Sequence, residues 1–552
     1  MQMESDPDLS FSVWGSFGKA RNQMSQFCDL CSDFSRFIAP AYHHDRCERS
    51  VQMRLYSMHK REFGLVFLAF FACFGMCVFV GLAGPPITST THQSVSQISG
   101  HPNGSDMATG PYYLATPMLT SYHQQFWVVA QIVTENKDDE SFEKKFHVSI
   151  AMDGLMENEQ VSKIVPSDHM HNRTRDLQCE RRNCSEILIL HMGYFDYSHY
   201  ALTIRFYGLE SIHNRYIIRD VIFYFRSYNP AFTRLEIWFR FVFLLSTFIA
   251  TCWFFVSMKK YSVVNWSLEQ KWMSVLMPLL ILYNDPVFAM SFLIDSWFPG
   301  ALDAIFQISF LSALLLFWLC VYHGLRQNDR RFITFYLPKV LLVGSIWLSM
   351  IVVAVWQEIE EVNDPTFSYK LDTDHFYGFK MFLIIASAVY LAYLVLLMIK
   401  AYSELRSMPF FGNYIVLIIF YNMLLFISTS LTDMRLKFLT LLVLFVLGIS
   451  ISVTFFRYGI GVLQDNFIAQ LSTNYHNSSE FLALYGLLNF YIYTMAYVYS
   501  PTSNAVLEHS VMKDNPAFSM VNDSDEDVVY GSDDDGRKPL TINLTSKDDD
   551  SD

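Results

Sequence analysis

Eight uninterrupted apolar runs, each of about the 20 residues that a helix needs to cross a bilayer, dominate this 552-residue chain. Helices of a soluble domain keep a polar face toward water, which these runs lack. Charged residues make up only 17% of the chain, against about 25% in soluble domains. The runs are Phe63–Leu82, Leu235–Met258, Trp272–Leu293, Leu302–Tyr322, Phe335–Trp356, Phe379–Ile399, Phe438–Phe456 and Phe481–Tyr499. They predict an α-helical polytopic membrane protein.

Basic residues near the ends of the runs predict the orientation, because Lys and Arg gather on the cytosolic side of a membrane. Arg54, Lys60 and Arg61 precede the first run. The N-terminal segment 1–62 is therefore predicted to be cytosolic, and the first span, 63–82, leads the chain into the lumen or the extracellular space. Basic and acidic loops then alternate as far as Arg406, and residues 235–499 are predicted to form a seven-helix bundle.

A further apolar segment, 411–432, leaves the last part of the topology open. If it crosses the membrane, there are nine spans and the C-terminal tail, 501–552, is lumenal. If it is re-entrant or interfacial, the basic residues on either side of it form one cytosolic loop and the tail is cytosolic. The charge distribution and the content of the tail favour the second interpretation.

The lumenal region between the first two spans divides into two parts. Residues 83–112 are rich in Ser, Thr, Gly, His and Pro and show no periodicity, so a linker is predicted. Residues 113–230 contain short β-branched and aromatic runs separated by polar turns, which is typical of an all-β sandwich. The predicted strands are Phe126–Ile132, Phe146–Met152, Ile187–His191, Tyr200–Phe206 and Val221–Ser227.

Covalent modification is predicted in the same region. Cys179 and Cys184 lie in a compartment that would be oxidising, where a local disulfide is favoured over two free thiols. Asn103 and Asn172 each begin an Asn-x-Ser/Thr acceptor sequence for N-glycosylation in an accessible segment.

Two polar features interrupt the apolar runs. Glu236 and Arg240 stand four residues apart at the start of the second span, where an intrahelical ion pair accounts for both charges. Asn284, Asp285 and Pro286 interrupt the third span, where proline breaks the helical hydrogen-bond ladder. This kink either lines a polar cavity or is structural, with Asp285 bonded to freed backbone groups.

The tail at 501–552 is acidic and poor in apolar residues, so it is predicted to be disordered. Asn515, Pro516 and Phe518 form an Asn-Pro-x-Phe sequence, which is typical of a sorting signal that adds a short strand to the sheet edge of an adaptor. Ser524 and Ser532 precede acidic runs and are candidate sites for an acid-directed kinase.

Chemistry at a catalytic or metal centre is not predicted. The chain has no GxSxG, no HExxH and no phosphate-binding loop, so it is not expected to be an enzyme and needs no cofactor. Cys28, Cys31 and Cys47 do not have the spacing of a standard zinc finger. A net charge of −13 argues against a nucleic-acid partner, which calls for a basic surface.

Several long strings closely resemble the transmembrane protein 181 family, which is related to Wntless and other GOLD-domain seven-transmembrane proteins. They include Glu269-Gln-Lys-Trp-Met-Ser274, Leu282-Tyr-Asn-Asp-Pro286, Phe317-Trp-Leu-Cys-Val-Tyr-His-Gly324 and Tyr485-Gly-Leu-Leu-Asn-Phe490. The resemblance runs from about Met53 to Tyr530, and the intervening segment 411–432 departs from it. It implies an N-terminal span, a lumenal GOLD-like β-sandwich, a seven-helix bundle and a cytosolic tail. It also implies a role in the action of a bacterial cytolethal distending toxin.

Three classes of function fit these features. The first is a trafficking or cargo receptor that cycles between Golgi, endosome and cell surface, with membrane lipid, a lumenal or extracellular ligand and cytosolic sorting adaptors as its partners. The second is a seven-helix signalling receptor. It is disfavoured because no Asp-Arg-Tyr sequence lies at the cytosolic end of a predicted span. The third is a channel or transporter, for which Asp285 is nearly the only support.

Overall fold

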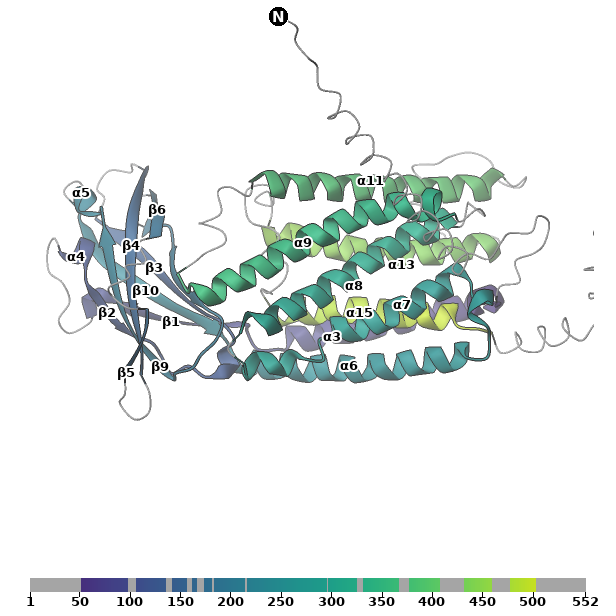
Figure 1. The fold of residues 1–552 in the computed structure, drawn as a ribbon, viewed down its shortest axis with the longest axis horizontal. Helices are drawn as coiled ribbons and strands as arrows, with labels where there is room; N and C mark the ends of the chain where they lie inside the picture. Colours follow the sequence, from purple (N-terminus) through teal and green to yellow (C-terminus); the bar gives the residue numbers. More distant parts are fainter. Residues whose placement is uncertain are drawn as a thin grey trace, which may run out of the picture. The chain divides into compact units, whose positions relative to one another are not determined.

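The structure is a computed structural model that describes residues 51–97, 106–135, 141–155, 161–165, 173–180, 183–213, 216–294, 296–324, 331–366, 377–407, 431–458 and 477–502. Within these ranges it contains a β-sandwich and eight helices long and apolar enough to cross a membrane (Figure 1). Both parts of the predicted fold class are confirmed. The segment 411–432 lies almost entirely outside the described residues.

The sandwich is built from ten antiparallel strands. In sheet order they run β1, β10, β3, β7, β6, β4, β9 and β2, with β8 added to β3 and β5 added to β4. Their bounds are β1 (Thr88–Ser94), β2 (Tyr112–Ala115), β3 (Phe126–Thr134), β4 (Ser141–Leu155), β5 (Val161–Val165), β6 (Arg173–Glu180), β7 (Asn183–Cys184), β8 (Ile187–Met192), β9 (His199–Tyr207) and β10 (Ile218–Tyr228).

The core of the sandwich follows from the alternation of buried and exposed residues along its central strands, since neighbouring side chains of a strand point to opposite faces. Phe206 and Phe223, from β9 and β10, meet inside this core and are completely buried. Each of the five strands predicted from the sequence is present, extended by one to eight residues.

The predicted linker at 83–112 is wrong in part, because residues 88–94 form strand β1. This strand pairs with β10 along its whole length, from Thr88 opposite Tyr228 to Ser94 opposite Ile222. Its first five residues are exposed on both faces, so its sequence lacks the alternation that marks a half-buried strand. The backbone of β10, rather than an apolar face of β1, provides its place in the sheet.

Among the described residues, one long helix precedes the sandwich in the chain and seven follow it. These long helices are α3 (Lys60–Leu82), α6 (Pro230–Met258), α7 (Leu268–Tyr283), α8 (Trp297–Gly324), α9 (Leu337–Asn363), α11 (Tyr377–Ser407), α13 (Leu431–Tyr458) and α15 (Ser478–Tyr499). Shorter elements are α2 (Arg54–Ser57), α4 (Asp106–Thr109), α5 (Glu210–His213), η1 (Val95–Gln97), η2 (Ser121–His123), η3 (Val263–Asn265), η4 (Phe288–Phe292) and the π-helical turn η5 (Phe332–Tyr336).

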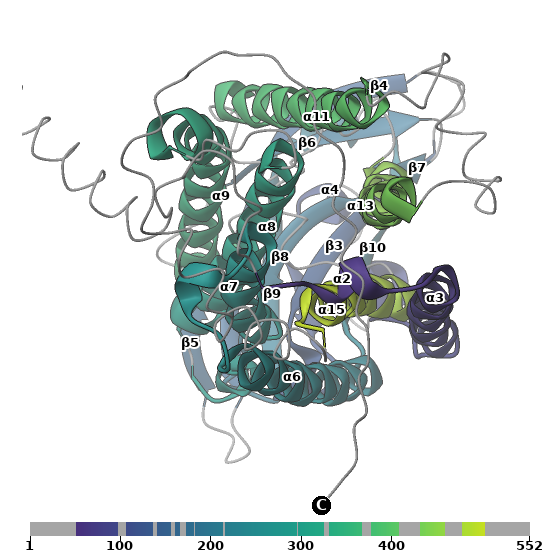
Figure 2. The same cartoon turned by 90° about the vertical axis from the view of Figure 1, so that its right-hand side faces the viewer.

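Helix α15 occupies the interior of the bundle and packs against α3, α6, α7 and α13 (Figure 2). Glycines permit its close approach to α3. A Cβ atom on Gly81 would collide with the backbone of Ser479, and one on Gly486 would lie only 3.0 Å from the Cys77 sulfur. The first and last spans of the described chain therefore pack directly together.

One residue separates the sandwich from the bundle. Asn229 follows β10 and is the N-cap of α6, where its Oδ1 accepts a hydrogen bond of 3.0 Å from the Ala231 amide. Pro230 occupies the first turn of the helix, where a missing amide proton costs nothing. The string Asn-Pro-Ala-Phe is therefore the start of a helix at this position.

Candidate functional site

Arg240 lies at the centre of a buried group of charges in the half of the bundle nearest the sandwich. Its Nε and Nη2 donate to the Glu236 carboxylate, both over 3.0 Å. Its Nη1 lies 3.4 Å from Asp303 of α8 and 3.8 Å from Asp285, the residue after the α7 C-cap. We call these four residues the Arg240 cluster. The pair predicted within one helix is thus joined by carboxylates from two other elements.

Aromatic rings complete the surroundings of the guanidinium. Its carbon atom lies 4.2 Å from the ring centre of Phe288 and 5.3 Å from that of Tyr485. The side chain of Arg240 is only 7% exposed, and that of Asp285 only 2%. With water excluded, the attraction between these charges is much stronger than on a protein surface, and each charge depends on the others for its solvation.

The predicted kink is the end of a helix. Helix α7 stops at Tyr283, and Asp285 adopts a left-handed backbone with φ of 53°, which is uncommon for a residue other than glycine. The Asp285 Oδ1 accepts a hydrogen bond of 3.1 Å from the Val287 amide, which closes the turn. Of the two alternatives left open by the sequence, these bonds match the structural one, although Asp285 also faces Arg240.

Asn284 extends the polar region toward the middle of the bundle. It is fully buried and exchanges side-chain hydrogen bonds of 2.9 and 3.0 Å with Asn489 of α15. Asn284 also donates to Thr247 of α6 over 2.9 Å, and the Thr247 hydroxyl lies 2.6 Å from that of Tyr493. Buried amides and hydroxyls are therefore satisfied by one another at the meeting point of α6, α7 and α15.

The sandwich reaches the Arg240 cluster through Gln124, which follows η2. The Gln124 amide nitrogen donates to the Glu236 carboxylate over 2.9 Å and to the Thr233 hydroxyl over 3.1 Å. Like Asp285, Gln124 has a positive φ, in its case 48°. A continuous chain of polar contacts thus runs from the sandwich through Glu236 to Arg240.

A second junction joins the sandwich to the end of α9. Arg173 of β6 forms an ion pair with Asp364. Arg175, which is only 2% exposed, donates to the Thr366 carbonyl over 2.9 Å, and the His191 amide donates to the Pro365 carbonyl over 2.8 Å. The two junctions lie at α6 and α9, so the sandwich is attached to the bundle at both of these helices.

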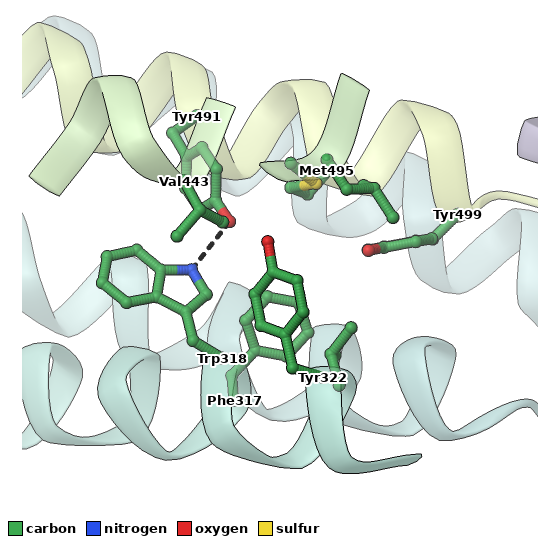
Figure 3. A pocket seen from close by; sticks show the side chains of 9 residues that line it. Phe317, Trp318, Tyr322, Val443, Tyr491, Met495 and Tyr499 are labelled. Atoms are coloured by element: carbon green, nitrogen blue, oxygen red, sulfur yellow. Dashed lines mark hydrogen bonds between the residues drawn. The ribbon is translucent and has the colours of Figure 1, made fainter. Parts of the chain in front are cut away.

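Figure 3 shows a different place, an aromatic-lined gap between α8, α13 and α15. The Trp318 indole donates to the Tyr491 hydroxyl across it over 2.8 Å, and the Tyr322 hydroxyl donates to Thr440 over 3.2 Å. The cavity that the described residues enclose here is about 10 Å³. Because a single water needs at least about 10–15 Å³, this gap has no room for a larger ligand.

The other predicted sites are placed as follows. Cys179 and Cys184 face each other at the junction of β6 and β7 and are joined by a disulfide. The remaining predictions fall on residues outside the described ranges, namely Asn103, Asn172, Asn515, Pro516, Phe518, Ser524 and Ser532.

The sequence pattern does not single out Gln124, Asp303, Asn489 as the partner of Asn284, or the Arg173–Asp364 contact. Asp303 carried a signal, since it is a carboxylate one residue inside a predicted span. Asn489 carried a weaker one, as a lone amide in the last apolar run. Gln124 and Arg173 lie in polar segments where nothing distinguishes them, because each contact bridges more than 100 residues of sequence.

Comparison with known proteins agrees with this architecture. Residues 110–228 match the family model described as TMEM181, GOLD domain, and residues 229–503 match the Wntless-like transmembrane domain. Transmembrane protein 181 of Homo sapiens is 47% identical over 482 residues, which are 87% of this chain and 94% of that protein. The chain belongs to the transmembrane protein 181 family.

The family boundary coincides with the helix start at Asn229, so the GOLD domain and the Wntless-like transmembrane domain meet at a single residue. The chain is an integral multi-pass membrane protein. Both partners of the Gln124–Glu236 contact lie inside these matched domains, one in each. The contact therefore connects the two domains that define the family.

Removing the central cation should destabilise the bundle. We expect Arg240→Leu to lower the free energy of unfolding by about 3–5 kcal/mol, because three carboxylates lose their shared partner in a buried site. Arg234→Leu is the matched control, since Arg234 is exposed on the same helix and loses only a contact of 5.5 Å with the Tyr122 ring, which should cost about 1 kcal/mol or less. Denaturant titration of the purified chain in lipid nanodiscs measures both, and equal stability of the two variants would contradict the account.

The α9 junction should survive mild acidification. Burial alone would raise the pKa of Asp364, but hydrogen bonds from Thr366 and Arg173 and the charge of Arg173 outweigh it and lower this pKa. A lowered pKa means that the ion pair contributes its stability above the ordinary aspartate pKa of about 3.9 and loses it only as the pH falls through the lower folded value. The contact should therefore be equally strong at about pH 7 and about pH 5.

Hydrogen exchange of the β6 and β8 amides, corrected for intrinsic rates, measures this junction. We expect equal protection at the two pH values in the unmodified chain and reduced protection at both in Asp364→Asn. Asp176→Asn is the control, because Asp176 is 45% exposed and its pairing with Lys145 is long, at 3.9 Å. Loss of protection in the unmodified chain between the two pH values would contradict the assignment.

Proposed function

We propose that this chain is a trafficking or cargo receptor that binds a lumenal or extracellular ligand with its GOLD domain and cycles between Golgi, endosome and cell surface. The observation that carries the proposal is the contact of Gln124 with Glu236, which links the ligand-facing domain to the buried charges of the bundle. A change in the position of the sandwich would alter the solvation of Glu236, and through it that of Arg240.

The contacts at the two junctions support a receptor in which ligand binding to the GOLD domain changes the conformation of the helix bundle as well. A tether would need only the covalent link at Asn229, yet Gln124 also binds α6 through Glu236, and Arg173 attaches the sandwich to the end of α9. A ligand can shift a conformational equilibrium only by binding two states differently. If a junction is intact in one state and broken in the other, the GOLD domain is held differently in the two states, and a ligand can bind one of them more tightly.

Orientation and sorting complete the proposal. We infer that the N-terminus is cytosolic from the basic residues before the first span, and that the acidic tail is cytosolic with them. The sorting role is assigned to the tail copy of Asn-Pro-Ala-Phe, at Asn515 and Phe518. The other copy has a structural task, because Asn229 caps α6 and Phe232 is buried.

The proposed ligand is defined only by its compartment, as a molecule that meets the GOLD domain on the lumenal or extracellular side of the membrane. The toxin role that the family resemblance implies fits the same arrangement, with the sandwich as the part of the receptor that a toxin would meet. We propose a binding protein rather than an enzyme, and the buried charges of the Arg240 cluster are assigned to coupling between domains.

A seven-helix signalling receptor is the alternative, since the same polar path would serve to transmit a signal across the bundle. Agonist-independent coupling to a G protein in cells that express the chain would favour that alternative. Ion currents in a bilayer that contains the purified chain would favour a channel or transporter.

Disabling the sorting signal in the tail should make the protein accumulate at the cell surface. We expect Asn515→Ala with Phe518→Ala to raise the surface pool on the order of twofold or more, because the adaptor loses both the turn and the side chain that it binds. Antibody uptake and surface biotinylation measure the distribution. Asn543→Ala with Leu544→Ala is the control in the same tail, and unchanged cycling of the first double variant would contradict the sorting role.

A further inference from the structure

A groove lies at the end of α6 farthest from the sandwich. It is lined by Phe255, Val256, Lys259 and Trp266 and has a volume of about 330 Å³. Its floor is the side of α6, and its wall is the chain that turns back from Lys259 to the start of α7. The Trp266 indole is held in that wall by a hydrogen bond of 3.3 Å to the Tyr261 carbonyl.

The depth of the groove in the membrane follows from the length of α6. Its 29 residues extend about 43 Å at about 1.5 Å per residue, whereas the hydrocarbon core of a bilayer is about 30 Å thick. Since α6 starts at the sandwich, the final turn, with Val256 and Lys259, reaches the opposite headgroup region. Trp266 lies at the same level, where tryptophan is enriched in membrane proteins.

The apolar part of the groove is continuous with the lipid-facing side of the helix. Val242, Ile249 and Val256 are spaced by seven residues along α6 and are 52%, 59% and 67% exposed. Because residues seven apart lie on the same face of a helix, they form one apolar stripe that ends in the groove. A hydrocarbon chain that lies along this stripe would enter the groove at Val256.

The polar end of the groove carries unpaired positive charge. Lys259 and Lys260 are both exposed, and neither forms an ion pair with a described residue. An apolar slot that opens along the acyl region and ends at the Lys259 ammonium group, with Lys260 next in the chain, matches the two halves of one molecule. That molecule has a long hydrocarbon chain and an anionic head.

We propose that this groove binds an anionic glycerophospholipid, with an acyl chain against Phe255 and Val256 and the phosphate and its anionic headgroup on Lys259 and Lys260. The site goes beyond the receptor function, since it lies at the opposite end of the bundle from the GOLD domain. Anionic phospholipids are concentrated in the cytosolic leaflet, which is where the proposed orientation puts this end of α6.

Native mass spectrometry of the full chain, released from micelles that contain equal amounts of phosphatidylserine and phosphatidylcholine, tests the proposal. We expect one retained phosphatidylserine in preference to phosphatidylcholine. In Lys259→Gln with Lys260→Gln that preference should fall on the order of tenfold, because two basic contacts are lost. Restoring charge with Lys259→Arg and Lys260→Arg should recover most of it.

The control pair is Lys60→Gln with Arg61→Gln. These two exposed cations lie at the same end of the bundle, where α3 begins, and the groove does not include them. They should leave the preference unchanged. An equal loss in the control pair would mean that lipid is held by general positive charge at this end, which would overturn the site.

Two further measurements separate the parts of the ligand. Val256→Trp fills the groove without changing the charge and should reduce retention of phosphatidylserine several-fold. Glycerophosphoserine, the headgroup without acyl chains, should not displace the retained lipid. Full retention in Val256→Trp, or displacement by the free headgroup, would mean that the lysines bind a soluble anion and that the proposal is wrong.

Discussion

The rest of the structure depends on how one guanidinium is solvated where water is absent. An unpaired charge is costly inside a bilayer, so Arg240 requires carboxylates at the same depth. Glu236 provides one from the same helix, and Asp285 and Asp303 come from two other elements. Three separate segments of the chain are thereby brought to one point of the bundle.

The position of this cluster is what makes it relevant to the GOLD domain. Glu236 has one carboxylate oxygen for Arg240 and one for Gln124. The same side chain therefore belongs to the buried charges and to the surface on which the sandwich rests. Since Asn229 alone separates β10 from α6, the sandwich has little freedom to leave this contact.

Much of this fold could be predicted because its signals are local. An apolar run of about 20 residues predicts a membrane-spanning helix, and a short alternation of apolar and polar residues predicts a strand, without reference to the rest of the chain. Strand β1 is not predictable from its own sequence, because exposed residues such as Thr90 show no pattern and depend on pairing with Arg226 in β10. The pairing of Glu236 with Arg240 is predictable because the two residues lie four apart on one helix. The contact of Gln124 is not, because its partner lies 112 residues away.

The most direct test of the central claim is a double-mutant cycle on Gln124→Ala and Glu236→Ala, read as the free energy of unfolding in nanodiscs. If the sandwich and the buried charges act as one unit, the two changes will be non-additive by about 0.5–3 kcal/mol. Additivity within about 0.5 kcal/mol would mean that the contact carries no coupling and would contradict the account.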